Sequence, residues 1–183
     1  MDWNKNLTAI DKTRYLQTQS MKRDRKSHKG ENGRIAVIGG SESFTGAPVI
    51  SAMAAYRAGA DLVRVLVPEE NRDVTASFSP EIIVDTYSAG NFDWEALEEA
   101  QEVIQWSDVA VIGPGGGEGD FSHLEEMLSE AVIDADAIGD LKETEDNILT
   151  PHPSEAEQLG DPESYVEETG NIVAVTGPSD RVV

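Results

Sequence analysis

Three short stretches of the sequence combine glycine, histidine and carboxylate residues in patterns that could bind an anionic ligand. Gly39-Gly40-Ser41 and Gly46-Ala47-Pro48 bound one loop, and Gly113–Gly117, with the sequence GPGGG, forms a second. In the third stretch, His152 lies between two prolines, which restrict its backbone. A glycine loop that ends a parallel strand and opens a helix is a common anion-binding site, although it can also be only a tight turn. We expect these loops to form an anion-binding crevice.

Carboxylates near these loops suggest a second kind of chemistry. Asp134 and Asp136 are two residues apart, so on an extended strand they would point the same way and could hold Mg²⁺ through water. Alternatively, Asp136 caps the turn that follows. Glu155 is either a first-turn acid favoured by the helix dipole or, in a phosphate site, the holder of a metal-bound water. No zinc-ligand spacing is present, so no residue is assigned as a direct metal ligand. Ser41 has no obvious partners for a hydrolase triad.

The elements that must position these residues alternate along the chain. Apolar runs rich in β-branched residues predict buried strands at 35–38, 61–67, 81–85, 108–112, 131–138, 147–150 and 171–175. Amphipathic or small-residue segments predict helices at 49–58, 69–76, 94–104, 121–128, 155–159 and 163–168. Such alternation indicates an α/β fold with a mainly parallel sheet and helices on both faces, a three-layer αβα arrangement. Loops at the carboxyl ends of the strands would then meet along one rim.

Length and composition indicate one domain. With 183 residues and no glycine- or proline-rich linker, we expect a single domain at 27–183 and, before it, an arm at 1–26 that packs on the domain or on a neighbour. The absence of cysteine excludes disulfides and thiolate metal sites. Nothing resembles a signal peptide or a bilayer-crossing run, so a cytoplasmic protein without a membrane partner is expected.

Charge is distributed unevenly along the chain. The sequence holds 35 acidic and 14 basic residues, a net charge of −21, and nine of the basic residues fall within residues 1–34. Such an acidic surface repels itself in dilute buffer, which is typical of proteins that work in concentrated salt. The same field argues against a nucleic-acid partner, except through the basic arm. A hydrophobic content of 39% and well-formed apolar runs exclude a disordered acidic chain.

Taken together, the motifs resemble those of a known family. The ordered set SHKG, VIGGSESFTGAP, AAYRAGADLVRV, VIGPGGG, VIDADAI and ILTPHPSE, from about Ser27 to Val183, is similar to the ADP/ATP-dependent NAD(P)H-hydrate dehydratases of the ribokinase-like superfamily. The resemblance implies a ribokinase-like fold and a carbon–oxygen lyase that repairs hydrated NADH or NADPH. ADP or ATP, with Mg²⁺, would phosphorylate the hydroxyl on the nicotinamide ring, and loss of phosphate would restore the double bond.

The resemblance also assigns binding residues motif by motif. The hydrated dinucleotide would contact Ala47, Gly115, Gly117, His152, Pro153, Ser154 and Glu155. The adenine nucleotide would contact Thr176, Gly177, Pro178, Ser179 and Asp180. Three positions depart from the family pattern, because threonine at 176, phenylalanine at 44 and glycine at 116 replace the usual lysine, tyrosine and leucine.

The catalytic aspartate of the family follows a later glycine-rich loop, which the resemblance places beyond Val183. We therefore expect the fold to lack its C-terminal part, the catalytic residue to lie outside these residues, and the chain to bind ligand while turning it over poorly. A homo-oligomer is expected. Two alternative functions are a ribokinase-like kinase for a vitamin precursor or sugar, whose product would keep the phosphoryl group, and a non-catalytic nucleotide-binding module.

The charge pattern predicts that folding depends on salt. Because counterions must screen the acidic residues, the protein should already be unfolded in dilute buffer. Once enough KCl is present for folding, the melting temperature should rise steeply toward molar KCl. Circular dichroism melts over a KCl series measure this dependence. A melting temperature independent of KCl would refute the prediction.

Overall fold

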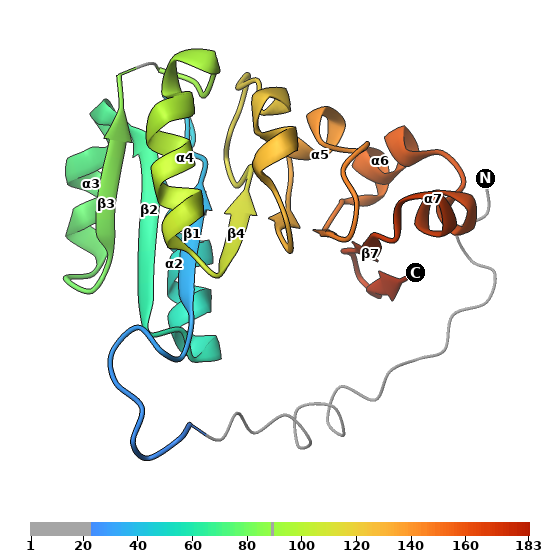
Figure 1. Cartoon of the computed structure of the whole chain (residues 1–183). Helices are drawn as coiled ribbons and strands as arrows, with labels where there is room; N and C mark the ends of the chain where they lie inside the picture. Colours follow the sequence, from blue (N-terminus) through green and yellow to red (C-terminus); the bar gives the residue numbers. More distant parts are fainter. Residues whose placement is uncertain (1–22, 89) are drawn as a thin grey trace.

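Eight strands form one sheet, in the order β3-β2-β1-β4-β5-β6-β7-β8, in a computed structural model that describes residues 23–88 and 90–183 (Figure 1). Neighbouring strands are parallel, except that β8 runs antiparallel to β7. The strands are β1 (Arg34–Ile38), β2 (Leu62–Pro68), β3 (Ile83–Tyr87), β4 (Val109–Ile112), β5 (Val132–Ile133), β6 (Ile148–Leu149), β7 (Ile172–Val175) and β8 (Arg181–Val182).

Helices connect the parallel strands. They are α2 (Ala47–Ala58), α3 (Arg72–Phe78), α4 (Leu97–Trp106), α5 (Ala137–Asp140), α6 (Pro153–Ala156) and α7 (Pro162–Thr169), with 3₁₀ turns η1 (Glu69–Asn71), η2 (Trp94–Ala96), η3 (Ser122–Met127) and η4 (Glu157–Leu159). The predicted mainly parallel α/β fold is confirmed. Within residues 23–88 and 90–183, no helix combines the length and the apolar character needed to cross a bilayer.

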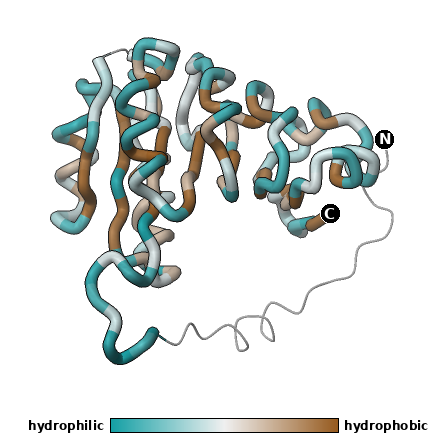
Figure 2. Tube along the Cα trace, in the orientation of Figure 1, coloured by the Kyte–Doolittle hydropathy of each residue, from teal (hydrophilic) through white to brown (hydrophobic). Residues whose placement is uncertain are grey.

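The centre of the sheet is buried on both faces, as its β-branched strands predict. Val37 packs with Val49 and Ala52 of α2 on one face, while Ala36 and Ile38 join the α4 side on the other. These three residues of β1 are fully buried, and the strands appear as apolar bands between more polar helix surfaces (Figure 2). Burial on both faces fixes the register, because a slip of one residue would move every side chain to the opposite layer.

Proline and glycine mark the two ends of the helix α2, as the sequence predicts. Pro48 lies in its first turn, where a missing N–H costs nothing, and Gly59 ends it in the left-handed region with φ 115°. The Gly59 N–H donates back to the carbonyl oxygens of Ala55 and Tyr56. The βαβ unit at 34–68 therefore matches the predicted strand, loop, helix and strand, with a helix that starts two residues earlier than expected.

Two predicted elements are wrong in type. The strand predicted at 131–138 stops after Val132–Ile133 and turns into α5, because aspartate and alanine follow the β-branched pair and favour a turn. The α-helix predicted at 121–128 is the 3₁₀ turn η3. Phe121, the residue before this turn, and Leu124 within it are fully buried and three residues apart, which matches the three-residue period of a 3₁₀ helix.

Smaller differences concern the ends of elements. The strand predicted at 81–85 lies at Ile83–Tyr87, and the helix predicted at 155–159 begins at Pro153 and changes to 3₁₀ at Glu157. The antiparallel strand β8 was not predicted. Its two residues give too short a pattern to detect, and only pairing with β7 defines them.

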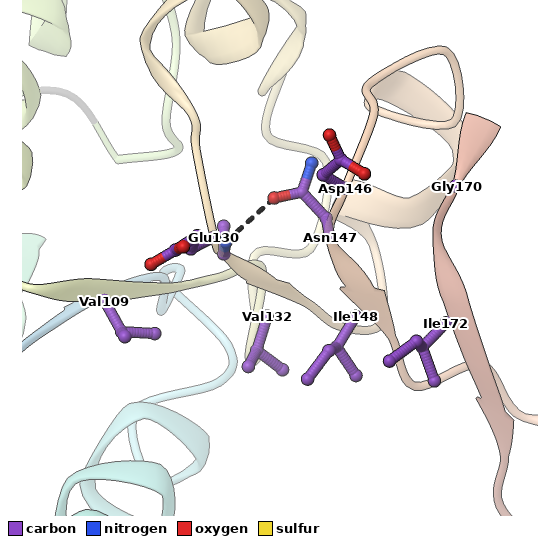
Figure 3. Close-up of a pocket in the computed structure, with 9 residues that line it drawn as sticks. Val109, Glu130, Val132, Asp146, Asn147, Ile148, Gly170 and Ile172 are labelled. Carbon is purple, nitrogen blue, oxygen red and sulfur yellow. Dashed lines mark hydrogen bonds between the residues drawn. The ribbon is translucent and has the colours of Figure 1, made fainter.

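One face of the sheet carries no described helix over β5–β7 and the start of β4. Val109, Val132, Ile148 and Ile172 point to this face from neighbouring strands and line a hollow of about 330 Å³ (Figure 3). Ile148 and Ile172 remain 39% and 48% exposed. The described helices after β4 pack on the opposite face, with Ile133, Leu149 and Val173. Described helices therefore cover both faces of β1, β4 contacts the α2 cluster through Val111, and β5–β7 are covered on one face.

Asp61 ties the segment before β1 to the amino end of the sheet. Its carboxylate accepts hydrogen bonds from the Gly30 N–H at 3.0 Å and from the Asn32 backbone and side-chain N–H groups at 3.1 and 2.8 Å. Arg23 also forms an ion pair with it at 2.9 Å. Residues 23–33 thus form a lead-in that contacts the domain, while most of the arm predicted at 1–26 lies outside the described residues.

Asp61→Asn should lower the free energy of unfolding at neutral pH. Hydrogen bonds, first from Asn32 and then from Gly30, and the charge of Arg23 hold the pKa of Asp61 below its ordinary 3.8. A carboxylate with a depressed pKa contributes stability that is complete above its ordinary pKa and is lost as the pH falls through its folded-state pKa. Urea unfolding in molar KCl should therefore show a difference between the two proteins that shrinks toward acid. A difference that does not change with pH would contradict this account.

Candidate functional site

The first glycine loop and the GPGGG loop lie against each other at the carboxyl ends of β1 and β4. The Gly40 N–H donates to the Pro114 carbonyl oxygen at 2.9 Å. A Cβ placed on Gly115 would lie 3.0 Å from the Cβ of Phe44 and 3.1 Å from that of Ala47. The structure thus brings together Ala47 and Gly115, two residues that the sequence assigns to one site.

Glycine is required where the chain leaves β4. Gly113 has φ 103°, and a Cβ there would overlap the Asp134 carbonyl oxygen and lie 2.7 Å from the Ala137 Cβ. Gly117, with φ 62°, has the Ser41 hydroxyl oxygen 2.9 Å from the position of a Cβ. The GPGGG loop is therefore packed between the first loop on one side and the turn after β5 on the other.

Two buried side chains support the first loop, and the sequence did not identify either as part of the site. Asn71 donates to the Ser41 carbonyl oxygen at 2.9 Å, and the Tyr87 hydroxyl lies 3.5 Å from the Gly40 carbonyl oxygen. Burial, with smaller contributions from Asp93 and Glu70, raises the pKa of Tyr87, so this hydroxyl stays neutral. No local motif marks these two positions, because each reaches the loop from a distant element.

The Ser41 hydroxyl is a second feature of this loop. It is buried beside Gly117 and has no hydrogen-bond partner among the described residues. Buried hydroxyl groups are usually paired, so an unpaired one marks a place where a further polar group could be accommodated. The unpaired hydroxyl does not change the prediction that Ser41 is not part of a hydrolase triad.

Asp134 and Asp136 do not lie side by side on a strand, so the premise for a shared Mg²⁺ site is wrong. Ala135 between them has φ 49°, and the two carboxylates bind separate loops. Asp134 accepts a hydrogen bond from the Thr150 hydroxyl at 2.7 Å, and Asp136 accepts one from the Gly117 N–H at 2.8 Å. Within the described residues, no group of three His, Cys, Asp or Glu side chains could hold a metal.

His152 is the N-cap of α6 and is exposed at the same edge of the sheet. Its backbone N–H donates to Glu155 at 2.7 Å, and its Nδ1 lies 3.1 Å from the Ser154 hydroxyl. The default role of Glu155 as a first-turn acid is thus confirmed as part of a capping box. The exposed ring of His152 carries little packing, which leaves it available to a ligand.

The segment from Thr176 to Asp180 closes the series at the far end. The Thr176 N–H donates to the Pro151 carbonyl oxygen at 2.9 Å, and the Gly177 N–H donates to Asp180 at 3.2 Å. We call the loops that follow β1, β4, β5, β6 and β7 the carboxyl rim. Contacts link each of these loops to the next, whereas the hollow in Figure 3 lies at the opposite ends of the strands.

Solved structures define the class of this fold. A ribokinase-like superfamily protein from Enterococcus faecalis has a TM-score of 0.74 at 22% identity, covering 88% of this chain and 63% of its own. An ADP/ATP-dependent NAD(P)H-hydrate dehydratase from Bacillus subtilis, co-crystallised with ATP and Mg²⁺, has a TM-score of 0.66 at 20% identity, covering 87% and 63%. The fold is ribokinase-like, as the motifs imply.

Sequence comparison defines the family. The model of the NAD(P)H-hydrate dehydratase family matches residues 35–172. An ADP-dependent (S)-NAD(P)H-hydrate dehydratase from Natrialba magadii is 36% identical over 163 residues, which cover 84% of this chain and 63% of the relative. The chain belongs to the NAD(P)H-hydrate dehydratase family and spans somewhat less than two thirds of that relative's length.

Gly113→Ala should strongly destabilise the fold. The substitution combines an unfavourable φ with overlap against fixed backbone, so the free energy of unfolding should fall by roughly 2–5 kcal/mol. The matched control is Gly177→Ala, because a Cβ there would come no closer than 3.9 Å to the nearest atom considered. It should change stability by less than about 0.5 kcal/mol. Equal effects in denaturant titrations would show that Gly113 is not constrained.

Proposed function

We propose that the carboxyl rim binds hydrated NADH or NADPH beside ADP or ATP and serves the nucleotide-dependent dehydration of the nicotinamide ring. The observation that carries this proposal is the unbroken series of contacts from Ala47 to Thr176. It aligns all the motif loops along one edge of the sheet. Family membership and the printed activity of the Natrialba magadii relative support the same reaction.

Backbone N–H groups are the donors best suited to an anionic ligand in this chain. The helix α2 has no acidic residue in its first turn and no side-chain cap at Gly46, so its first N–H groups are not used by a cap. The helix dipole adds partial positive charge at that end. In a protein of net charge −21, these groups can hold a diphosphate where side-chain cations are scarce.

The proposed division of the rim follows the motifs. Ala47, Gly115 and Gly117 would hold the hydrated dinucleotide, and the His152 ring would donate a hydrogen bond to it, with the capping segment Pro153–Glu155 in contact beside the ring. The segment at 176–180 would contact the adenine nucleotide. The nucleotide segment adjoins the His152 segment through the Thr176–Pro151 hydrogen bond, which would bring the phosphoryl donor near the ring hydroxyl. Residues 27–183 would act as one ligand-binding domain.

Mg²⁺ would accompany the nucleotide. The cation usually keeps several waters and binds substrate phosphates with one or two carboxylates, which fits a rim whose described residues form no cluster of three ligands. Asp180 is the carboxylate within the proposed nucleotide segment. Mg²⁺ would neutralise phosphate charge there. We also propose a cytoplasmic homo-oligomer without a nucleic-acid partner, because the acidic surface opposes binding to polyanions.

The proposal is tested by turnover and binding in molar KCl. Hydrated NADPH is incubated with the chain, Mg²⁺ and ADP or ATP, and recovery of reduced-nicotinamide absorbance is followed together with release of phosphate. Binding of hydrated NADPH by calorimetry supports the site, and absorbance recovery supports the full reaction. A product that keeps the phosphoryl group would replace the proposal with a kinase. Absence of binding to either ligand would reject the site.

His152→Ala should weaken binding of hydrated NADPH while leaving the fold intact. Loss of one hydrogen bond to a charged group costs about 1.5–3 kcal/mol, or roughly 10- to 100-fold in affinity. His28→Ala is the matched control, because His28 is also exposed but lies in the lead-in before β1. Calorimetry should show a loss for the first variant alone. Unchanged affinity with a large drop in stability would make His152 structural.

A further inference from the structure

The turn after β5 holds two loops of the carboxyl rim through one carboxylate each. Asp136 accepts the Gly117 N–H at 2.8 Å, and Asp134 accepts the Thr150 hydroxyl at 2.7 Å. Gly117 belongs to the GPGGG loop, and Thr150 precedes the His152 segment by two residues. The three-residue turn therefore sets the separation between two groups of proposed ligand contacts.

An unfavourable backbone conformation makes this double attachment possible. Ala135 has φ 49°, a left-handed region that is unfavourable for a residue other than glycine. With Ala135 in this region, Asp134 turns toward β6 and Asp136 toward the loop after β4. Residues persist in such conformations only when their surroundings enforce them, and they are concentrated at functional sites.

The carboxylate of Asp136 is not used as an ordinary helix cap. Asp136 occupies the N-cap position of α5, yet its side chain makes no capping hydrogen bond there. Its oxygen instead reaches across 19 residues of sequence to Gly117. A carboxylate accepting a backbone N–H makes a charge-assisted bond, roughly twice as strong as a neutral one. An exposed aspartate thus fixes the end of the glycine loop.

Fixing the end of this loop orients the donor that remains. The Gly116 N–H donates to the Gly113 carbonyl oxygen at 2.9 Å, and Asp136 takes the Gly117 N–H at 2.8 Å. Among the described residues, the Gly115 N–H has no such partner. Gly115 also abuts Ala47 at the start of α2. Gly115 is thus the one of these three glycines whose N–H has no partner among the described residues, and it lies beside the first loop.

We propose that Asp136 is a positioning residue of the ligand site. It holds the GPGGG loop so that the Gly115 N–H is presented to the ligand, and Asp134 does the same for the His152 segment through Thr150. This inference rests on the proposed function of the rim. It replaces the metal-binding role suggested by the spacing of the two aspartates with a role in loop geometry.

The test separates loop geometry from ligand binding. Amide hydrogen exchange at Gly115–Gly117 is measured by NMR without ligand, and affinity for hydrated NADPH by calorimetry, in Asp136→Ala and Asp136→Asn. The alanine variant should exchange the Gly117 amide about 10-fold faster and bind about 10-fold more weakly, the loss of one hydrogen bond. The asparagine variant keeps an acceptor oxygen and should recover most of both effects.

Asp161→Ala is the matched control, because its carboxylate accepts the Ser164 N–H at 3.2 Å in an ordinary cap of α7. Asp161→Ala should lose about as much stability as Asp136→Ala, without changing the exchange rate of the Gly117 amide or the affinity for hydrated NADPH. If the parent chain binds hydrated NADPH and Asp136→Ala binds it equally well, the positioning role is overturned while the proposed function stands. If the parent chain does not bind the ligand, the proposed function fails first. An asparagine variant as impaired as alanine would also overturn the role of the hydrogen bond.

Discussion

The carboxyl rim depends on one close approach of backbone to backbone, where β4 ends against the turn after β5. Gly113 turns at a φ that other residues rarely adopt, with the Asp134 carbonyl oxygen occupying the space of a side chain. Parallel pairing of β4 with β5 brings these two strand ends together. The GPGGG loop then lies between the first loop and the aspartate turn. A side chain at Gly113 would push the GPGGG loop away from the turn after β5.

Electrostatics and backbone geometry act together at this rim. The chain is strongly acidic, yet its family acts on phosphorylated dinucleotides with the help of nucleotides. Helix termini and glycine loops can hold anions without adding basic side chains, because their N–H groups carry the positive potential. Two aspartates within the rim, the half-buried Asp134 and the exposed Asp136, accept hydrogen bonds from hydroxyl or N–H donors of the protein itself. Their negative charge is thereby used to order the loops.

The parts of the fold that follow from local rules could be predicted, and the parts set by distant contacts could not. Pro48 and Gly59 determine the limits of α2 through their own backbone preferences, and the parallel-sheet rule placed the loops on one edge. Asn71 and Tyr87 carry no local signal, because their role depends on where other strands bring them. The left-handed Ala135 was missed because alanine gives no indication of φ 49°. The aspartates were therefore noticed, but their chemistry was misassigned.

The face of β5–β7 that carries no described helix has a consequence for how the protein responds to different salts. Val132, Ile148 and Ile172 form a row of β-branched side chains that remain in contact with water. Ions that screen carboxylate repulsion do not all treat such a row alike, because sulfate and phosphate are excluded from protein surfaces and strengthen apolar association. Chloride at the same ionic strength would screen the carboxylates and strengthen apolar association of this face less. The identity of the anion, as well as the total salt concentration, therefore influences whether the protein self-associates through this face.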